Sequence, residues 1–449
     1  MSDTVSHTVH KALKIRIYPS VPQKMILDKT FGCCRVVYNE RLAEHINYWN
    51  TYKDNPNRPK FKGTLPKELR EKKYPWLGED TIAEALIQSQ RNCESAYSNF
   101  FRSFNKQRKG RKVGYPKFKS KKSHRDSFTV YVIRKEGLID FNLRTIFLPK
   151  LKDTKFRIAN SSLKSKWIEW FLEATPLNIT VSRNTCGEYY CSVLFEREQD
   201  LEQNIRLSNS IGLDFSPNNL YIDSNNNPAP NYKPYKQLNK KKLTKLQRRL
   251  SRKQKGSKNR EKARVKLARF EKHIADSRKD YIEKETLRLV RSYDVIGIED
   301  LNLQGMMKFS HNAKNYVDTS WYTFTQKLIW KSQFNDCIVV KADRFYPSSK
   351  TCNHCGHVNQ NLTLKDRKWI CPNCGTEIIR DENAGRNLRD NAINLLVDEI
   401  KSTLGWEPSE VMSMEDMEAT YCNGMLSGVS YEVENQSSDA LKGSSSVFS

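Results

Sequence analysis

Alternating apolar and polar positions predict several short strands in the first half of the chain. Residues 11–18 alternate the apolar side chains of Leu13, Ile15 and Ile17 with basic ones, which is typical of a half-buried strand. Similar runs predict strands at residues 127–132, 145–148, 178–183 and 189–195. We expect the first strand to join these later strands in a small barrel or sheet.

Apolar positions spaced three and four residues apart predict helices at residues 23–49 and 81–104. Residues 52–74 between them are polar and contain three prolines, so we expect an irregular segment there. Residues 106–122 (KQRKGRKVGYPKFKSKK) predict a basic loop. The helices are therefore expected as an insertion between the first strand and the later ones.

A different pattern begins at residue 211, where apolar runs are short and uninterrupted. Residues 211–215 (IGLDF) and 293–299 (YDVIGIE) predict buried strands that lead into an acid, and residues 218–225 (NNLYIDSN) predict a hairpin partner. A further strand is expected at residues 338–340, with helices at 320–334 and 380–400.

Residues 233–284 predict a pair of basic amphipathic helices rather than a tail. They hold 21 Lys and Arg against 5 Asp and Glu, and their leucines keep helical spacing on both sides of a turn at Gly256–Ser257. A solvated helix face is the alternative interpretation of this charge. After Gly405 little periodicity remains, which predicts a disordered acidic tail.

The charge of the chain makes a nucleic acid the expected partner. The 449 residues have a formal charge of +26; residues 402–449 hold eight acids and one lysine, so residues 1–401 carry +33. Such an excess repels itself unless a polyanion neutralises it. A basic, ribosome-like protein is the alternative. Hydrophobic residues make up 37%, which excludes a wholly disordered chain.

Four of the 11 cysteines have the spacing of a metal site. The pairs Cys352-x2-Cys355 and Cys371-x2-Cys374 are separated by 15 residues, and a glycine follows each pair. Four thiolates at this spacing suit one tetrahedral Zn²⁺ in a structural role. Four unrelated thiols are the alternative.

Three acids follow buried strands or open a helix, namely Asp214, Glu299 and Asp381. A carboxylate directly after a buried strand lies at the edge of the sheet. Three such acids, if they converge, would hold two Mg²⁺ ions, because hard oxygen ligands suit this ion. A helix cap or a salt bridge is the alternative role for each single acid.

The order of these motifs resembles that of the transposon-encoded TnpB (OrfB) family. The matching segments are KIRIYPSVPQKMILDKTFGCCRVVYNERL, SAYSNFFRSF, GYPKFKSKKSHRDSFTV, IGLDF, VIGIEDL, CNHCG, CPNCG and RDENAGRNL. The resemblance covers residues 10–400. One departure is Phe215-Ser216-Pro217, where many relatives carry a turn with glycine.

The resemblance implies an α/β multidomain fold. It implies an RNase H-like (RuvC) nuclease domain with an inserted four-cysteine zinc ribbon, and an N-terminal WED-like β-barrel with an inserted helical REC domain. The expected boundaries are 1–19 and 109–203 for the barrel, 20–108 for REC, 204–347 and 379–404 for RuvC, 348–378 for the ribbon, and 405–449 for the disordered acidic tail.

The resemblance also implies an RNA-guided DNA endonuclease, related to type V CRISPR nucleases. Two Mg²⁺ ions at Asp214, Glu299 and Asp381 and one structural Zn²⁺ are the implied cofactors. A guide RNA from the transposon end and double-stranded target DNA beside a short flanking motif are the implied partners. A nuclease-inactive RNA-guided repressor, a DNA-joining transposase and a CRISPR-associated compact type V effector remain as alternatives.

No stretch of about 18 apolar residues occurs, so no membrane association is expected. The N-terminus has no apolar signal segment, and we expect a location in the prokaryotic cytoplasm, on the nucleoid. No protein partner is predicted from the sequence.

Several side chains are candidates for contacts with nucleic acid. The aromatic residues Tyr115, Phe118 and Phe128 either stack on unpaired bases or pack the barrel. Arg380 either contacts the scissile strand or pairs with Glu382. The basic candidates are Lys117, Lys119, Lys241, Lys245, Arg248, Arg249, Arg252 and Lys253. The candidates for reading a flanking DNA motif are Gln88, Gln90 and Thr129.

Overall fold

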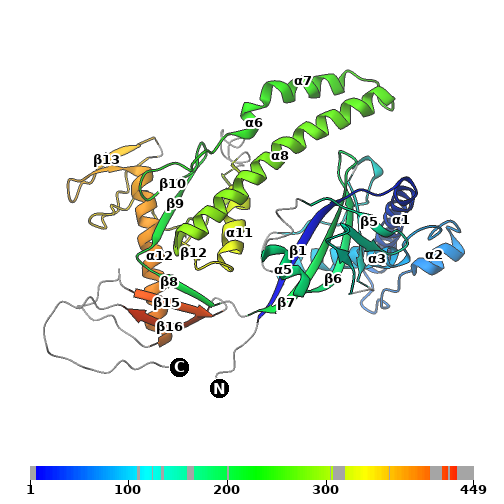
Figure 1. Cartoon of the computed structure of the whole chain (residues 1–449), viewed down its shortest axis with the longest axis horizontal. Helices are drawn as coiled ribbons and strands as arrows, with labels where there is room; N and C mark the ends of the chain where they lie inside the picture. The colour runs from blue at the N-terminus through cyan, green and yellow to red at the C-terminus, as the bar shows by residue number, and fades with distance from the viewer. Residues whose placement is uncertain are drawn as a thin grey trace. The chain divides into compact units, whose positions relative to one another are not determined.

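The computed structural model divides the chain into two compact units (Figure 1). The N-terminal unit covers Thr8–Glu198, and the C-terminal unit covers Gln199–Ser449 together with Met1–His7. The structure describes residues 7–108, 112–123, 125–132, 136–158, 166–199, 202–303, 305–306, 319–363, 365–404, 417–422 and 425–431.

A four-stranded sheet brings together the two ends of the N-terminal unit. Its order is β1-β7-β6-β2, formed by β1 (His7–Ile17), β7 (Tyr189–Gln199), β6 (Thr175–Arg183) and β2 (Asp126–Tyr131). The expected pairing of the first strand with later strands is thus confirmed. A second, three-stranded sheet consists of β3 (Ile139–Asp140), β4 (Thr145–Leu148) and β5 (Lys152–Lys155).

Two long helices lie between β1 and β2 along the chain, as the periodicity predicts. α1 (Val21–Tyr52) begins at a capping box around Ser20, and α3 (Ala83–Phe104) ends the insertion. The expectation of irregular structure at 52–74 is wrong in part, because α2 (Pro66–Lys72) forms there. Its first residue is a proline, whose fixed φ suits the first turn of a helix. This unit also contains η1 (Lys121–Ser123) and α5 (Lys166–Glu173).

The central sheet of the C-terminal unit has the order β10-β9-β11-β12. β9 (Ser210–Ser216) and β10 (Leu220–Asp223) form an antiparallel hairpin. β11 (Val295–Ile298) runs parallel to β9, and β12 (Ile338–Lys341) runs parallel to β11. Helices cover both faces of this sheet, so the predicted α/β class is confirmed for this unit.

One face of the sheet packs against α8 (Lys258–Ser292) and α11 (Trp321–Ser332). Ile298 of β11, Leu289 of α8 and Phe324 of α11 are all completely buried in one hydrophobic cluster. Burial of this apolar face supplies the main driving force for packing both helices on the sheet.

The opposite face packs closely against α12 (Arg380–Leu404), and glycines allow this approach. A Cβ atom on Gly212 of β9 would lie 1.9 Å from the Gly385 carbonyl oxygen. A Cβ atom on Gly297 of β11 would lie 2.2 Å from the Leu388 carbonyl oxygen. Side chains at either position would push the helix away, so these glycines hold the first turns of α12 against β9 and β11.

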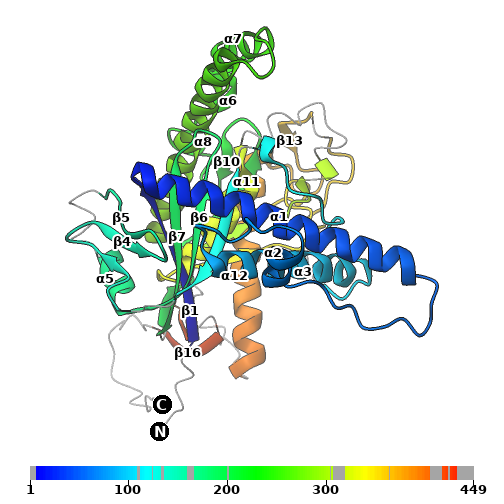
Figure 2. The same ribbon diagram turned by 90° about the vertical axis from the view of Figure 1, so that its right-hand side faces the viewer.

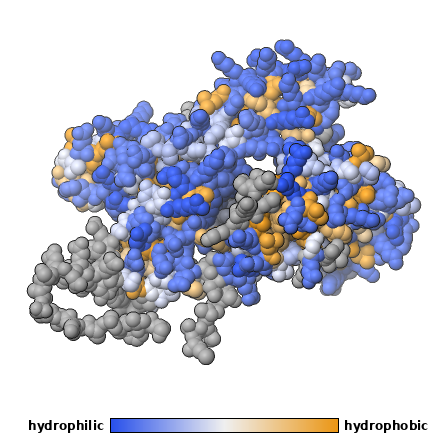
Figure 3. Space-filling model, in the orientation of Figure 1, coloured by the Kyte–Doolittle hydropathy of each residue, from blue (hydrophilic) through white to orange (hydrophobic). Residues whose placement is uncertain are grey.

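The predicted pair of basic helices is confirmed. α7 (Lys240–Ser251) follows the short α6 (Tyr235–Leu238) and lies beside the start of α8 (Figures 1 and 2). Gly256 has a φ of +85° in the turn between them. The surface of this hairpin is mostly hydrophilic (Figure 3). None of the described helices is long and apolar enough to cross a membrane.

The four-cysteine segment forms a small ribbon with its own core. β13 (Lys368–Ile370) and β14 (Glu377–Ile379) pair antiparallel on either side of the second cysteine pair, and α12 begins directly after β14. Trp369 and Ile378 pack with Cys352 and Cys371 in a buried cluster.

The prediction of a disordered tail over 405–449 is wrong for residues 417–422 and 425–431. β15 (Met417–Cys422) and β16 (Met425–Tyr431) form a hairpin, and β15 pairs with β8 (Glu202–Arg206) in a three-stranded sheet. Alternate residues of β15, starting with Met417, are buried against α12. The remaining residues of 405–449 lie outside the described residues.

Candidate functional site

The three predicted acids line one pocket of about 650 Å³ in the C-terminal unit. Leu213 of β9 pairs with Ile298 of β11 in a parallel ladder. The next residues along these strands, Asp214 and Glu299, therefore lie side by side at the same edge of the sheet. Asp381 comes from the first turn of α12, which the glycine contacts hold against these strands.

Burial and neighbouring negative charges shift the pKa values of two of these acids. Burial raises the pKa of Asp214 well above its usual value, and the negative charges of Glu299 and Asp381 raise it further. Burial also raises the pKa of Glu299, although a hydrogen bond donated by Ser348 Oγ to Glu299 Oε1 at 2.8 Å opposes this change. A bound cation would relieve the repulsion between these carboxylates.

Two arginines face the third acid. The Arg367 Nη1 atom lies 3.1 and 3.0 Å from the two carboxylate oxygens of Asp381, and Arg380 Nε lies 3.4 Å from Asp381 Oδ1. Arg380 pairs with Asp381, and Glu382 pairs with Arg386 one turn along α12. The sequence pattern does not predict the role of Arg367, because this residue lies between the two cysteine pairs and belongs to no recognisable motif.

The predicted metal ligands form the expected cluster of four thiols. The Sγ atoms of Cys352 and Cys374 are 3.7 Å apart, and those of Cys355 and Cys371 are 3.6 Å apart. A tetrahedral ion with Zn–S bonds of about 2.3 Å requires sulfur atoms about 3.8 Å apart, so the cluster fits such an ion. All four Sγ atoms lie within 4.8 Å of one another; within the described parts of the chain, no other group of His, Cys, Asp or Glu ligands is as compact.

The six basic residues predicted on α7 and just after it line one hollow of about 930 Å³. No acid contributes to its lining. The helix therefore presents a continuous positive surface, which is the pattern expected for contact with phosphates. The lining residues are Lys240, Lys241, Thr244, Lys245, Arg248, Arg249, Arg252 and Lys253.

The basic and aromatic candidates of the N-terminal unit divide into exposed and packed residues. Lys117 and Lys119 are both exposed, and the Lys119 ammonium also lies 3.9 Å from the ring centroid of Tyr38. Phe118 is 55% exposed, and Phe128 is buried with its ring centroid 5.3 Å from that of Phe31. Tyr115 is 40% exposed and contacts Phe100 edge to face, with ring centroids 5.1 Å apart. Tyr115 and Phe118 thus remain available to a base, and Phe128 is a core residue.

The three candidates for reading a flanking motif make contacts within the unit. The Gln88 and Gln90 side chains of α3 are mostly buried and donate to Glu84 and Glu94 at 2.7 and 3.3 Å. Burial leaves these amides little surface for a base edge, which counts against the prediction. Thr129 shares a hydrogen bond of 2.9 Å with Thr180 across β2 and β6.

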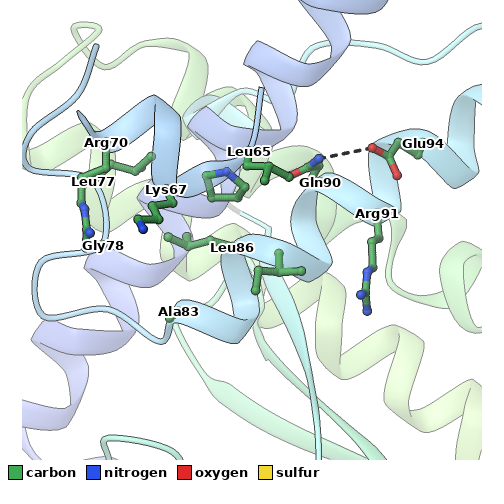
Figure 4. A pocket seen from close by; sticks show the side chains of 12 residues that line it. Leu65, Lys67, Arg70, Leu77, Gly78, Ala83, Leu86, Gln90, Arg91 and Glu94 are labelled. Carbon is green, nitrogen blue, oxygen red and sulfur yellow. Dashed lines mark hydrogen bonds between the residues drawn. The ribbon is translucent and has the colours of Figure 1, made fainter. Parts of the chain in front are cut away.

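An apolar pocket of about 420 Å³ lies between α2 and α3 of the N-terminal unit (Figure 4). Its floor includes Leu77 and Leu86, and Arg70 and Arg91 also line it. Figure 4 also shows the hydrogen bond from Gln90 to Glu94 on α3. The sequence pattern does not predict this pocket, because it depends on the missed helix α2.

The fold and site define an α/β protein with three acids in one pocket at the edge of a mainly parallel sheet and with an inserted four-cysteine ribbon. Three family models match the chain: one described as "Probable transposase" over residues 192–310, one described as "Cas12f1-like, TNB domain" over 321–388, and one described as "Helix-turn-helix domain" over 8–54. In the structure, residues 8–54 hold β1 and the single continuous helix α1.

The chain is similar over most of its length to bacterial proteins. A protein of Streptomyces pristinaespiralis, provisionally named an RNA-guided DNA endonuclease, is 31% identical over 85% of this chain and 89% of its own length. InsQ of Escherichia coli K12, with the same provisional name, is 29% identical over 84% of this chain and 91% of its own. A solved Cas12f1 complex with guide RNA and target DNA covers 85% of this chain and 99% of its own, at 12% identity and a TM-score of 0.48. The chain belongs to the TnpB (OrfB) family.

Proposed function

We propose that this protein is an RNA-guided DNA endonuclease of a transposable element, which hydrolyses phosphodiester bonds at Asp214, Glu299 and Asp381. The observation that carries the proposal is that these three acids line one pocket, one from β9, one directly after β11 and one from the first turn of α12. The names of the two bacterial relatives support the activity. A nuclease-inactive repressor is not favoured, because all three acids are present.

The donor set of the pocket suits Mg²⁺, for which carboxylate oxygens are the preferred protein ligands. When bound, two such ions would supply an activated water and stabilise the leaving oxygen. Asp214 and Glu299, fixed by adjacent parallel strands, and Asp381 would hold them. The hydrogen bond from Ser348 orients the Glu299 carboxylate.

Arg367 is suited to binding the phosphate group that is cleaved. Its guanidinium lies at the rim of the pocket and now pairs with Asp381. A guanidinium can also bind phosphate oxygens, through two parallel N–H donors. We infer that Arg367 moves to the DNA phosphate when a metal ion occupies the Asp381 carboxylate. Arg380, whose side chain is largely buried beside Asp381, remains in place.

The hollow along α7 is proposed to bind the backbone of the guide–target duplex. An RNA–DNA heteroduplex is recognised by its shape and phosphates rather than by its sequence. The row of basic side chains, which includes Arg248 and Arg252, provides this contact without discrimination between bases. We further propose that the N-terminal unit, Thr8–Glu198, corresponds to most of the WED-like barrel expected at 1–19 and 109–203, together with the REC insertion (20–108).

We propose Zn²⁺ as the ion of the four-cysteine cluster and a structural role for it. Four thiolates leave no ligand position open for a substrate. The ribbon would form residues 348–378, within a RuvC domain over 204–347 and 379–404.

A DNA-joining transposase is the second candidate, since one matching family is described as "Probable transposase". The two activities differ in their products. The experiment is incubation of the purified protein, with its co-purified RNA, with plasmid DNA that carries the sequence complementary to that RNA. Cut plasmid in the presence of Mg²⁺, and none with Asp214→Ala, supports the endonuclease. Joined DNA products would support the transposase, and no RNA of defined sequence would contradict the proposal.

A further inference from the structure

Two buried asparagines of α12 lie close to the candidate nuclease site. Asn383 is 6% exposed and Asn387 is 4% exposed. They are one helical turn apart, and Asn383 follows Asp381 by two residues. A side-chain amide buried this deeply needs partners for its donor and for its acceptor.

The partners of both amides lie in the loop that leads into the four-cysteine ribbon. Asn383 Nδ2 donates to the Thr351 carbonyl oxygen at 2.7 Å, and its Oδ1 accepts from the Asn353 backbone N–H at 2.9 Å. Asn387 Nδ2 donates to the carbonyl oxygens of Ser348 and Thr351, both at 2.7 Å. Its Oδ1 accepts from Asn353 Nδ2 at 3.0 Å.

The same loop connects a candidate catalytic acid to the cysteine cluster. It begins at Ser348, whose hydroxyl donates to Glu299. It includes Cys352, whose Sγ atom is one of the four clustered sulfurs. The two chain neighbours of Cys352, Thr351 and Asn353, form hydrogen bonds with the buried asparagines of α12. An ion held by the cysteines therefore restrains the backbone that the two amides hold.

We propose that Asn383 and Asn387 are positioning residues that couple the metal-bound ribbon to the nuclease site. Binding of the ion fixes the loop at Cys352, and the two amides transmit this restraint to the first turn of α12. The position of Asp381 thus depends on an ion that does not touch it. This inference rests on the proposed function for its catalytic consequence, while the structural coupling can be tested without cleavage.

The replacement Asn387→Asp keeps the shape of the side chain and removes the donor. A carboxylate would then face two carbonyl oxygens, so both contacts to Ser348 and Thr351 are lost. The matched control is Asn335→Asp at the end of α11, which removes an amide donor to the Lys331 carbonyl at 2.8 Å, away from the ribbon. Asn353→Ala is a second variant, for use if Asn387→Asp does not fold.

Hydrogen exchange with and without a zinc chelator tests the coupling directly. Zinc content is measured for each protein before chelation. In the wild type and in Asn335→Asp, removal of the ion should accelerate exchange of amides 380–388 by about tenfold, since the restraint is comparable to a buried hydrogen bond. In Asn387→Asp these amides should exchange fast with the ion still bound, and chelation should change them less than about twofold.

Cleavage adds a readout that a general loss of stability does not give. We expect Asn387→Asp to keep its affinity for guide RNA and to need several times more Mg²⁺ for half-maximal cleavage. If the wild type does not cut DNA, the proposed function fails while the exchange result still decides the coupling. Unchanged exchange at 380–388 on removal of zinc from the wild type, or wild-type behaviour of Asn387→Asp, would overturn the inference.

Discussion

A truncation after Leu404 tests whether the C-terminal hairpin belongs to the core of the C-terminal unit. It removes β15 and β16, and with them the pairing of β15 to β8. Met417 and Tyr421 are each 1% exposed and Leu426 is 9% exposed. These three side chains pack in one cluster with residues of α12, including Ile400. We expect the truncated chain to lose a large part of the stability of this unit.

The size of the loss follows from the buried side chains. Full burial of one large apolar side chain contributes about 1.5–3 kcal/mol, so three contribute about 4–9 kcal/mol. This is an upper value, because the unfolded chain already buries part of its surface. A whole domain is stable by only about 5–15 kcal/mol, so the truncation removes a comparable amount.

Urea unfolding followed by tryptophan fluorescence and far-UV circular dichroism measures this loss. A truncation after Tyr431 is the matched control, because it removes neither strand, and it should unfold like the full chain. The single change Met417→Ala should cost about 2–5 kcal/mol. A chain ending at Leu404 with a free energy of unfolding within about 0.5 kcal/mol of the full chain would refute the reasoning, because that is the effect of an ordinary surface change.

Further predictions concern the acids, the charges and the cysteines. Asp214→Asn should abolish cleavage without changing the affinity for guide RNA in a filter-binding assay. Folding raises the pKa of Asp214, so the stability that the Asp214 carboxyl contributes is present below its unfolded pKa and is lost as pH rises through its folded pKa. Without added metal, Asp214→Asn should therefore raise the melting temperature at neutral pH. An unchanged or lower melting temperature would contradict the raised pKa. Arg248→Ala combined with Arg252→Ala should weaken binding of the guide–target duplex and reduce the slope of its salt dependence by about two, whereas an unchanged slope would exclude phosphate contacts at these residues. Cys352→Ser should lower zinc content and melting temperature together, and full zinc retention would exclude the cluster as the zinc site.

The sequence predicts the parts of the site that depend on local pattern. Short apolar runs that end in an acid predict that Asp214 and Glu299 each lie at a sheet edge, and the structure adds that the two strands, β9 and β11, pair with each other. The glycines at 212 and 297 lie within the same runs, and the structure explains them by the approach of α12. The cysteine spacing predicts a cluster that the sulfur distances confirm.

Contacts between distant segments could not be predicted from the sequence. The pairing of Arg367 with Asp381 depends on how the ribbon folds back over α12, and no spacing marks this arginine. The hairpin of β15 and β16 was missed because its alternation is short and lies in an acidic, serine-rich region, although alternate residues of β15 are buried. Gln88 and Gln90 have the chemistry of base-reading residues, but their position on α3 buries them.

The most direct test of RNA-guided cleavage at the three-acid pocket is to change the guide. The protein is expressed with a version of its co-purifying RNA in which the segment that pairs with the target is replaced by a new sequence. The complex is then incubated in Mg²⁺ with two plasmids, one that matches the original guide sequence and one that matches the new guide sequence. Each plasmid carries the same library of flanking sequences. The proposed function predicts that cutting moves to the plasmid that matches the new guide and disappears with Asp214→Asn, Glu299→Gln or Asp381→Asn. Cutting that ignores the guide, or persists in all three variants, would contradict it.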